Sequence, residues 1–274
     1  MIKQDYRPPV APLFVPGDRP ERFAKAAASG ADAVVLDLED GVAPASRVLA
    51  RQAVAEHGID NVPVIIRVNA WASGALEADL AALVDARFDA LMLAKAESAA
   101  DIQRVHRALG RQVPVIALVE TGGAYRDLAG LLNAPGVVQA AFGSLDLALD
   151  LGCQPSWDAL AYCRGSLLLQ SRLAGLPAPL DGVATRFDDP ELVRQEALKA
   201  VGLGFGGKLA IHPRQLAPIK DAFMPDAEAI AWARAVEQVS LSGAAVQVAG
   251  EMIDRPLIER ARRILSRITG APEA

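Results

Sequence analysis

The sequence contains little of what soft metal ions or a disulfide framework require. Its 274 residues include two cysteines, Cys153 and Cys163, and three histidines, His57, His106 and His212. No CxxC spacing occurs and the histidines are scattered, which argues against a zinc-type site. We interpret both cysteines as small buried residues of a protein that works in a reducing compartment.

Long apolar runs and an excess of basic charge are also missing. No run approaches the ~18 uninterrupted apolar residues of a membrane span, and the first residues lack an apolar signal region. We therefore expect a soluble, cytoplasmic protein without a membrane partner. The net charge is −5 and no basic stripe stands out, so a nucleic-acid partner is not expected.

What the sequence does contain is an alternation of strand-like and helix-like segments. Apolar runs end repeatedly on a polar or glycine-bearing turn, about eight times along the chain, and amphipathic segments at helical spacing lie between them. The predicted strands are 12–16, 33–36, 62–66, 90–93, 115–119, 137–142, 178–180 and 208–211. The predicted helices are 20–29, 46–57, 74–87, 98–109, 122–132, 157–175 and 190–201. This alternation predicts an α/β fold, a TIM (β/α)₈ barrel over residues 1–222, with polar groups delivered at the carboxyl ends of the strands.

The alternation stops after His212. A helix is predicted over 226–240, a short hairpin over 243–253 turning at Gly250, and a basic helix over 256–268. Residues 223–274 therefore form a C-terminal helical and hairpin appendage. It either docks on its own barrel or packs on a neighbouring subunit.

Glu120 and Asp146 are the strongest candidates for chemistry, because each follows a predicted strand. Neighbouring strands lie about 5 Å apart, so the two carboxylates would converge at the barrel mouth. Two carboxylates without soft ligands suit Mg²⁺ or Mn²⁺. The alternative is that both side chains merely cap the helices that follow them.

Arg67 ends an apolar strand, where an unpaired guanidinium would be costly. It either grips a substrate carboxylate or forms an ion pair with Asp37 or Glu39. Alternation places Asp37 and Glu39 on one face, and we assign this acidic pair a scaffolding role. Lys95 could form a Schiff base, but the carboxylate pair at the same mouth argues against an imine mechanism.

Other candidates carry weaker signals. Arg19 and Lys25 follow a glycine bend near a helix start, and they either bind phosphate or face solvent. His212 is either a general base or a structural residue. The glycine-rich segment 202–208 resembles a phosphate loop, but Leu209 replaces the required Ser or Thr, so we interpret it as a helix-to-strand turn.

Taken together, several motifs resemble the citrate lyase β-subunit family of CoA-thioester lyases, within the aldolase/citrate lyase superfamily. They are 14–17 (FVPG), 31–42 (ADAVVLDLEDGV), 67–69 (RVN), 95–98 (KAES), 120–121 (ET), 142–146 (FGSLD), 207–213 (GKLAIHP) and 250–256 (GEMIDRP). They span nearly the whole chain in the family's order, so the resemblance is specific.

The resemblance implies a Mg²⁺-dependent barrel that assembles as a homotrimer or as a hexamer of trimers. It implies that Glu120 and Asp146 hold the metal and that Arg67 binds substrate oxygen. Asp254 matches an aspartate that enters the neighbouring subunit's site as a catalytic acid. The remaining matched residues fall in CoA-binding or substrate-binding segments (Arg19, Lys25, Ile211, His212) or support the site (Asp37, Glu39, Lys95).

The activity implied is cleavage or formation of a 3-hydroxyacyl-CoA thioester, such as malyl-CoA or citramalyl-CoA. The products of cleavage would be acetyl-CoA or propionyl-CoA and a 2-oxo acid. Two alternatives stay open: a CoA-independent 4-hydroxy-2-oxo-acid aldolase, and a citrate lyase β subunit that works only within a larger complex.

Overall fold

The computed structural model describes residues 6–241, 247–248 and 251–269. The chain divides into two compact units after Lys220. The first unit holds the strands of the predicted barrel, and the second holds the last two helices and a short hairpin.

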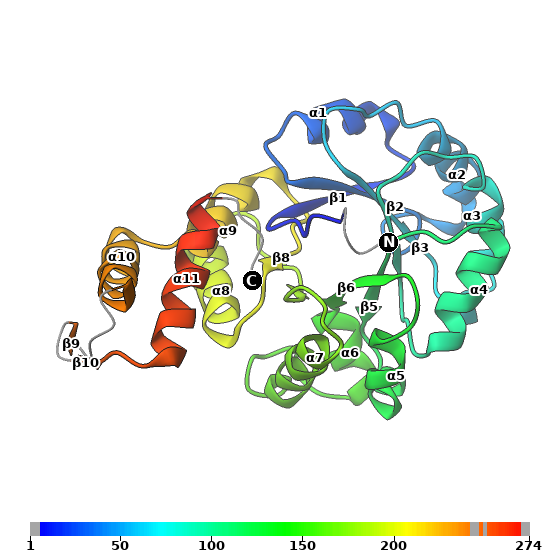
Figure 1. Ribbon diagram of the computed structural model, residues 1–274. Coiled ribbons are helices and arrows are strands. Elements are labelled where there is room, and N and C mark those ends of the chain that lie inside the picture. Colours follow the sequence, from blue (N-terminus) through cyan, green and yellow to red (C-terminus); the bar gives the residue numbers. More distant parts are fainter. Residues whose placement is uncertain (1–5, 242–246, 249–250, 270–274) are drawn as a thin grey trace. The chain divides into compact units, whose positions relative to one another are not determined.

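Eight strands form one parallel sheet whose spatial order follows the chain, and Figure 1 shows them ringed by helices. The strands are β1 (Pro12–Pro16), β2 (Ala33–Asp37), β3 (Val64–Val68), β4 (Ala90–Leu93), β5 (Val115–Val119), β6 (Val137–Phe142), β7 (Leu180–Asp181) and β8 (Gly207–Lys208). The ring closes because residues at and after β8 bond to the first strand: the Phe14 N–H donates to Ala210 O and the Ala210 N–H donates to Pro12 O. The predicted (β/α)₈ barrel is confirmed.

Strands form here because their residues are buried on both faces. Every residue of β2, β4, β5 and β6 is buried. Alternate residues point inward and fill the barrel, among them Val35, Met92 and Leu118. The others face outward beneath the helices, as expected of parallel strands covered on both sides.

The third strand lies two residues later than predicted. Pro63 has no N–H to give to a neighbouring strand, and its carbonyl accepts from the Val34 N–H just before β3 begins. Arg67 is consequently inside β3, opposite Asp37 on β2 and Met92 on β4. The seventh and eighth strands are only two residues long each, shorter than predicted.

The barrel helices are α1 (Phe23–Ala27), α2 (Arg47–Ala55), α3 (Leu76–Ala82), α4 (Ala99–Leu109), α5 (Leu128–Leu132), α6 (Ser144–Leu151), α7 (Ala161–Leu173), α8 (Pro190–Leu203) and α9 (Leu216–Phe223). The helix predicted over 122–132 is two pieces, a 3₁₀ helix η4 (Gly122–Arg126) and α5, because the Asp127 carboxylate caps α5 through the Gly130 N–H. The helix α9 was not predicted.

The glycine-rich segment 202–208 is a helix-to-strand turn, as predicted. Gly204 ends α8 with a φ of +113°, a conformation that favours glycine. Lys208 is 2% exposed, and its ammonium donates to Asp181 Oδ2 at 2.8 Å. Arg164 Nε lies 3.1 Å from the other oxygen of Asp181, so this lysine belongs to a buried ion network and cannot meet a phosphate.

The second unit is built on two helices that pack against each other, α10 (Ala227–Leu241) and α11 (Arg255–Thr269). Ala233, Val236 and Ala261 form its buried core. Two strands of two residues each, β9 (Gln247–Val248) and β10 (Glu251–Met252), pair antiparallel as the predicted hairpin requires. The predicted turn at Gly250 lies outside the described residues.

The composition predicted that the chain has no membrane-spanning segment and that both cysteines are buried. No helix in the described part of the chain is long and apolar enough to span a bilayer. The expectation that both cysteines are buried is wrong: Cys153 is exposed and Cys163 is half-buried. Cys153 follows the end of α6 on the surface, a position that its sequence neighbours did not reveal.

Candidate active site

A cavity of about 310 Å³ opens at the carboxyl ends of the barrel strands. Its walls are apolar on the inner side, where Phe14, Leu118 and Leu209 close the barrel interior. Its polar lining comes from separate strand ends: Asp37 of β2, Arg67 of β3, Glu120 after β5 and Asp146 after β6. Four of the charged residues singled out in the sequence therefore line one cavity.

Arg67 is held by two carboxylates and an aromatic ring. Its Nε and Nη2 donate to the two oxygens of Asp37, both at 2.7 Å, and its Nη1 lies 2.9 Å from Glu39 Oε2. The guanidinium carbon lies 4.7 Å from the centroid of the Phe14 ring. A guanidinium has five N–H groups, so this geometry leaves N–H groups on both Nη atoms for a ligand. The predicted ion pair of Arg67 with Asp37 and Glu39 is therefore present. Binding of a substrate carboxylate by Arg67 stays a prediction.

The acidic turn after β2 is shaped by Asp37. Its carboxylate accepts from the backbone N–H groups of Glu39 (2.9 Å) and Gly41 (2.8 Å). A Cβ at Gly41 would lie 2.5 Å from Asp37 Oδ2, so glycine is needed there for the close approach. Asp37 thus fixes both the turn and Arg67, which is a scaffolding role.

Lys95 joins three carboxylates, of which Glu39 also pairs with Arg67. Its ammonium donates to Glu39 Oε1 at 2.5 Å and lies 3.6 Å from Asp146 Oδ1 and 3.9 Å from Glu120 Oε1. Its backbone N–H donates to the same Glu120 oxygen at 3.0 Å. The carboxylates of Glu120 and Asp146 therefore converge on one cationic centre, as the sequence predicted for neighbouring strand ends.

Burial and neighbouring charges shift the pKa values of the ionisable side chains in this cluster. Desolvation and the nearby charge of Glu39 raise the pKa of Glu120 to about 8, although Lys95 and Arg67 oppose the shift. Burial also raises the pKa of Glu39, against the attraction of Arg67 and Lys95. For Lys95, burial alone would lower the pKa, but the hydrogen bond to Glu39 and the surrounding carboxylates raise it above its usual value. Lys95 is thus an ammonium at neutral pH, which is unsuited to imine formation.

The donor set fits a hard divalent cation. Asp37, Glu39, Glu120 and Asp146 supply four carboxylates against the two cations Arg67 and Lys95. Within the described residues no group of three or more His, Cys, Asp or Glu side chains is arranged to hold a metal. Two carboxylates with water in the remaining positions is the arrangement that Mg²⁺ favours.

The alternative, that these two acids only cap helices, does not match the geometry. The residue at the start of η4 is Thr121, and the one at the start of α6 is Gly143. Glu120 precedes the first of these positions, and Asp146 lies inside the first turn of α6. Neither acid occupies a capping position, so their convergence needs another explanation.

A family model described as HpcH/HpaI aldolase/citrate lyase matches residues 11–213, which include all residues that line the cavity. The chain belongs to this family. A citrate lyase subunit beta-like protein of Mycobacterium tuberculosis is 38% identical over 263 residues, covering 93% of this chain and 94% of that protein. The mitochondrial citramalyl-CoA lyase of Rattus norvegicus is 30% identical, covering 98% and 88%. The resemblance found in the sequence is confirmed.

Solved structures of the family agree. The crystal structure of CitE from Mycobacterium tuberculosis in complex with magnesium, acetoacetate and coenzyme A superposes with a TM-score of 0.87 at 36% identity. The match covers 95% of this chain and 98% of that one. That neighbour therefore holds a magnesium ion and a CoA molecule on the same fold.

The other residues expected to bind substrate lie around the mouth or in the second unit. Arg19 and Lys25 are exposed on the segment that follows β1. Ile211 is 42% exposed and lines the cavity. His212 stacks on Phe187 with ring centroids 4.6 Å apart, and its Nδ1 accepts from the Arg214 N–H. That bond makes the His212 ring a helix cap and favours the structural interpretation over a general base.

Asp254 lies in the second unit of this chain. Its Oδ1 accepts from the Leu257 N–H at 3.2 Å, so it caps the start of α11. The side chain is exposed. A catalytic role for Asp254 stays a prediction.

Gly143 is a site residue that the sequence reasoning missed. A Cβ built on it would lie 2.4 Å from both Cβ and Oε2 of Glu120, so only glycine allows Glu120 its position. Glycine has no side chain, so its role beside Glu120 leaves no signal in the pattern of polar residues. The GS pair after β6 was matched as part of the family motif, but its physical reason appears only in three dimensions.

Replacing Gly143 by alanine should therefore displace Glu120. We expect Gly143→Ala to lose about 1–3 kcal/mol of stability through overpacking and to weaken Mg²⁺ binding at least about tenfold. Titration calorimetry and urea unfolding measure the two effects. Gly165→Ala on α7 is the matched control, because nothing lies within 4 Å of its added Cβ and helix propensity favours alanine. Unchanged Mg²⁺ affinity in Gly143→Ala would contradict the packing argument.

The raised pKa of Glu120 predicts a pH dependence with a definite sign. The unfolded carboxyl ionises near 4.5, whereas the folded one keeps its proton up to about 8. The folded state binds more protons in this window, so metal-free stability should fall as the pH rises from about 4.5 to about 8. A ligating carboxylate must be ionised, so Mg²⁺ affinity should rise over the same window. Urea unfolding across this pH window, with and without Mg²⁺, tests both expectations. In Glu120→Gln, the part of the change in stability with pH that comes from Glu120 should disappear.

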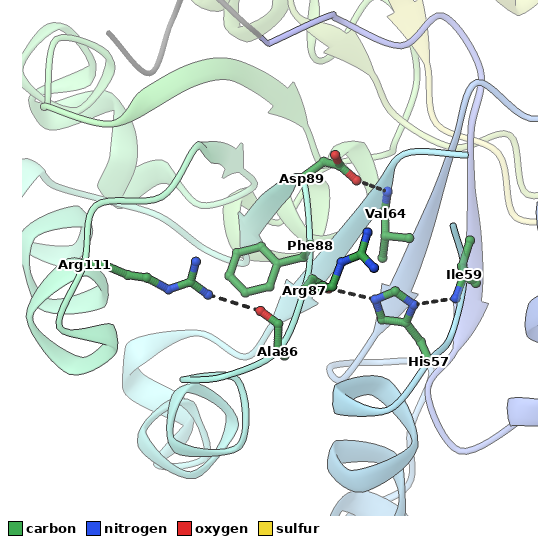
Figure 2. A pocket seen from close by; sticks show the side chains of 8 residues that line it. All are labelled: His57, Ile59, Val64, Ala86, Arg87, Phe88, Asp89 and Arg111. Atoms are coloured by element: carbon green, nitrogen blue, oxygen red, sulfur yellow. Dashed lines mark hydrogen bonds between the residues drawn. The ribbon is translucent and has the colours of Figure 1, made fainter. Parts of the chain in front are cut away.

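A second hollow, of about 230 Å³, lies at the opposite ends of β3 and β4 (Figure 2). Figure 2 shows His57 between two backbone segments: its Nε2 lies 2.7 Å from Arg87 O, and its Nδ1 accepts from the Ile59 N–H. Arg111 Nη2 donates to Ala86 O at 3.2 Å. These side chains tie loops together and lie far from the carboxylate cluster in the barrel, so the hollow carries no chemistry.

Proposed function

We propose that this chain is a Mg²⁺-dependent carbon–carbon lyase that cleaves or forms a 3-hydroxyacyl-CoA thioester. Malyl-CoA and citramalyl-CoA are the substrates we expect, each giving acetyl-CoA and a 2-oxo acid; a thioester that carries a methyl group on its α-carbon would give propionyl-CoA instead. The observation that carries the proposal is the convergence of Glu120 and Asp146 on one cationic centre beside Arg67. Family membership and the magnesium and CoA complex of the Mycobacterium tuberculosis neighbour support it.

We assign Glu120 and Asp146 as the metal ligands. Magnesium bound there would act as a Lewis acid on the oxygen atoms of the substrate. Manganese suits the same donors. Asp37 and Glu39 hold the guanidinium of Arg67 in place, so its remaining N–H groups are preorganised toward the cavity.

In the cleavage direction, Arg67 stabilises negative charge on the substrate oxygen as the 3-hydroxyl releases its proton to water. The electron pair of that oxygen forms the carbonyl of the 2-oxo acid, and the C–C bond breaks. The bonding pair passes to the α-carbon of the thioester, giving an enolate that must be protonated. We assign Asp254 as the acid that supplies this proton.

Because Asp254 lies in the second unit, we infer that it acts in a neighbouring subunit of a homotrimer or hexamer. We assign the exposed Arg19 and Lys25 to the CoA phosphates, and Ile211 at the cavity edge together with its neighbour His212 to substrate binding. Mixing inactive Asp254→Asn subunits with inactive Arg67→Met subunits should restore part of the activity. Mixtures without any recovered activity would count against action between subunits.

The function is tested by mass spectrometry of the purified protein with Mg²⁺ against a panel of 3-hydroxyacyl-CoA thioesters. We expect release of a shorter acyl-CoA and a 2-oxo acid from at least one thioester, and no release in excess chelator. Cleavage of 4-hydroxy-2-oxo acids instead would identify an aldolase. Release of free CoA with an intact hydroxy acid would identify a thioesterase. No turnover alone, with acyl-carrier partners co-purifying, would identify a subunit of a larger complex.

A further inference from the structure

Lys95 has an unusual backbone. Among the described residues other than glycine it alone has a positive φ, +49°. This left-handed conformation is costly for a residue with a Cβ and persists only where surrounding contacts impose it. Two contacts hold Lys95 in this conformation: its N–H donates to Glu120 Oε1, and its side chain donates to Glu39 Oε1.

The side chain of Lys95 lies close to three acidic side chains at once. Its ammonium reaches carboxylates delivered from β2, β5 and β6, at 2.5 Å from Glu39, 3.9 Å from Glu120 and 3.6 Å from Asp146. An ammonium is a compact, nearly spherical cation, which makes it a fair substitute for a metal ion among oxygen donors. Without a cation at this point, three acidic side chains would face one another at the barrel mouth.

We propose that the Lys95 ammonium is the resident cation of this carboxylate cluster in the metal-free protein, and that a divalent ion binds by taking Glu120 and Asp146 from it. This inference rests on the proposed metal role of those two acids. The hydrogen bond to Glu39 is the contact that Lys95 can keep, because Glu39 also pairs with Arg67 and is not one of the two ligands.

Two consequences follow for metal affinity. The ammonium competes for the two ligands, and its charge repels a divalent ion a few ångströms away. A partly screened repulsion of this kind corresponds to about tenfold in affinity. Lys95 therefore holds the ligands in position at the cost of weaker metal binding.

The test is Mn²⁺ binding to the purified protein, followed by electron paramagnetic resonance of the free ion, together with thermal unfolding without metal. We expect Lys95→Met to bind Mn²⁺ about tenfold more tightly and to unfold at a lower temperature than the unmodified protein when metal is absent. Lys95→Gly is the second variant, because glycine accepts the positive φ and avoids strain. Lys199→Met removes an exposed lysine on α8 and is the charge-matched control.

The outcomes separate two kinds of failure. Equal or weaker Mn²⁺ binding in both Lys95 variants, with binding still abolished by Glu120→Gln, would overturn the role of Lys95 and leave the metal site standing. Equal Mn²⁺ binding in Glu120→Gln and the unmodified protein would overturn both this inference and the proposed metal site. Tighter binding in Lys199→Met of the same size would also overturn the inference, since the effect would then be one of net charge.

Discussion

Glu120→Gln should abolish Mg²⁺-dependent turnover and leave the metal-free protein at least as stable as before. Glutamine has the shape of a protonated glutamate, and Glu120, with a pKa of about 8, is largely protonated in the metal-free protein at neutral pH. Its Oε1 can still accept the Lys95 N–H. What is lost is the negative charge that a divalent ion needs.

Turnover of the CoA thioester found in the panel should fall by at least about 10²–10³ in Glu120→Gln. The stabilisation that Mg²⁺ gives to thermal unfolding should disappear with it, because a ligand stabilises only the state it binds. We expect Asp146→Asn to behave likewise. Asp150→Asn, one turn further along α6, is the matched control: its carboxylate accepts from the Gly122 N–H and does not face Lys95. Undiminished Mg²⁺-dependent turnover in Glu120→Gln would refute the metal assignment.

The barrel was predictable because its signal is redundant. Parallel strands buried on both faces leave continuous apolar runs, and each run is followed by polar residues where the chain leaves the sheet. The weakest predictions are β7 and β8, two residues each. The Lys208 N–H of β8 donates to Val10 O, before β1, and the Ala210 N–H that follows β8 donates to Pro12 O. Closure of a barrel depends on these distant contacts, which no local pattern records.

The site was predictable in part for the same reason. Glu120 and Asp146 follow neighbouring strands, so their convergence follows from strand order. Two features could not be read from the sequence: the positive φ of Lys95 and the need for glycine at 143. Both are set by the position of the Glu120 carboxylate, a tertiary property. The place of Asp254 relative to a barrel is likewise not encoded in any spacing.

Arg67→Met should remove activity and destabilise the protein together. Asp37 and Glu39, which are 3% and 6% exposed, would lose the guanidinium that pairs them. Breaking a buried pair by removing one partner costs about 3–5 kcal/mol. The positive field where charge develops on the substrate is lost as well, so kcat/KM should fall by at least about 10²–10³.

Stability and chemistry at Arg67 can be separated with two further variants. Arg67→Lys keeps the charge but cannot donate from Nε and Nη2 to both oxygens of Asp37, so part of the stability should return while activity stays low. Arg51→Met breaks another buried pair, Arg51 with Asp79 at 2.8 Å, away from the cavity. It should lower the urea midpoint comparably and leave kcat/KM of the folded enzyme within about threefold. Equal loss of kcat/KM in Arg51→Met and Arg67→Met would mean that Arg67 acts through stability alone.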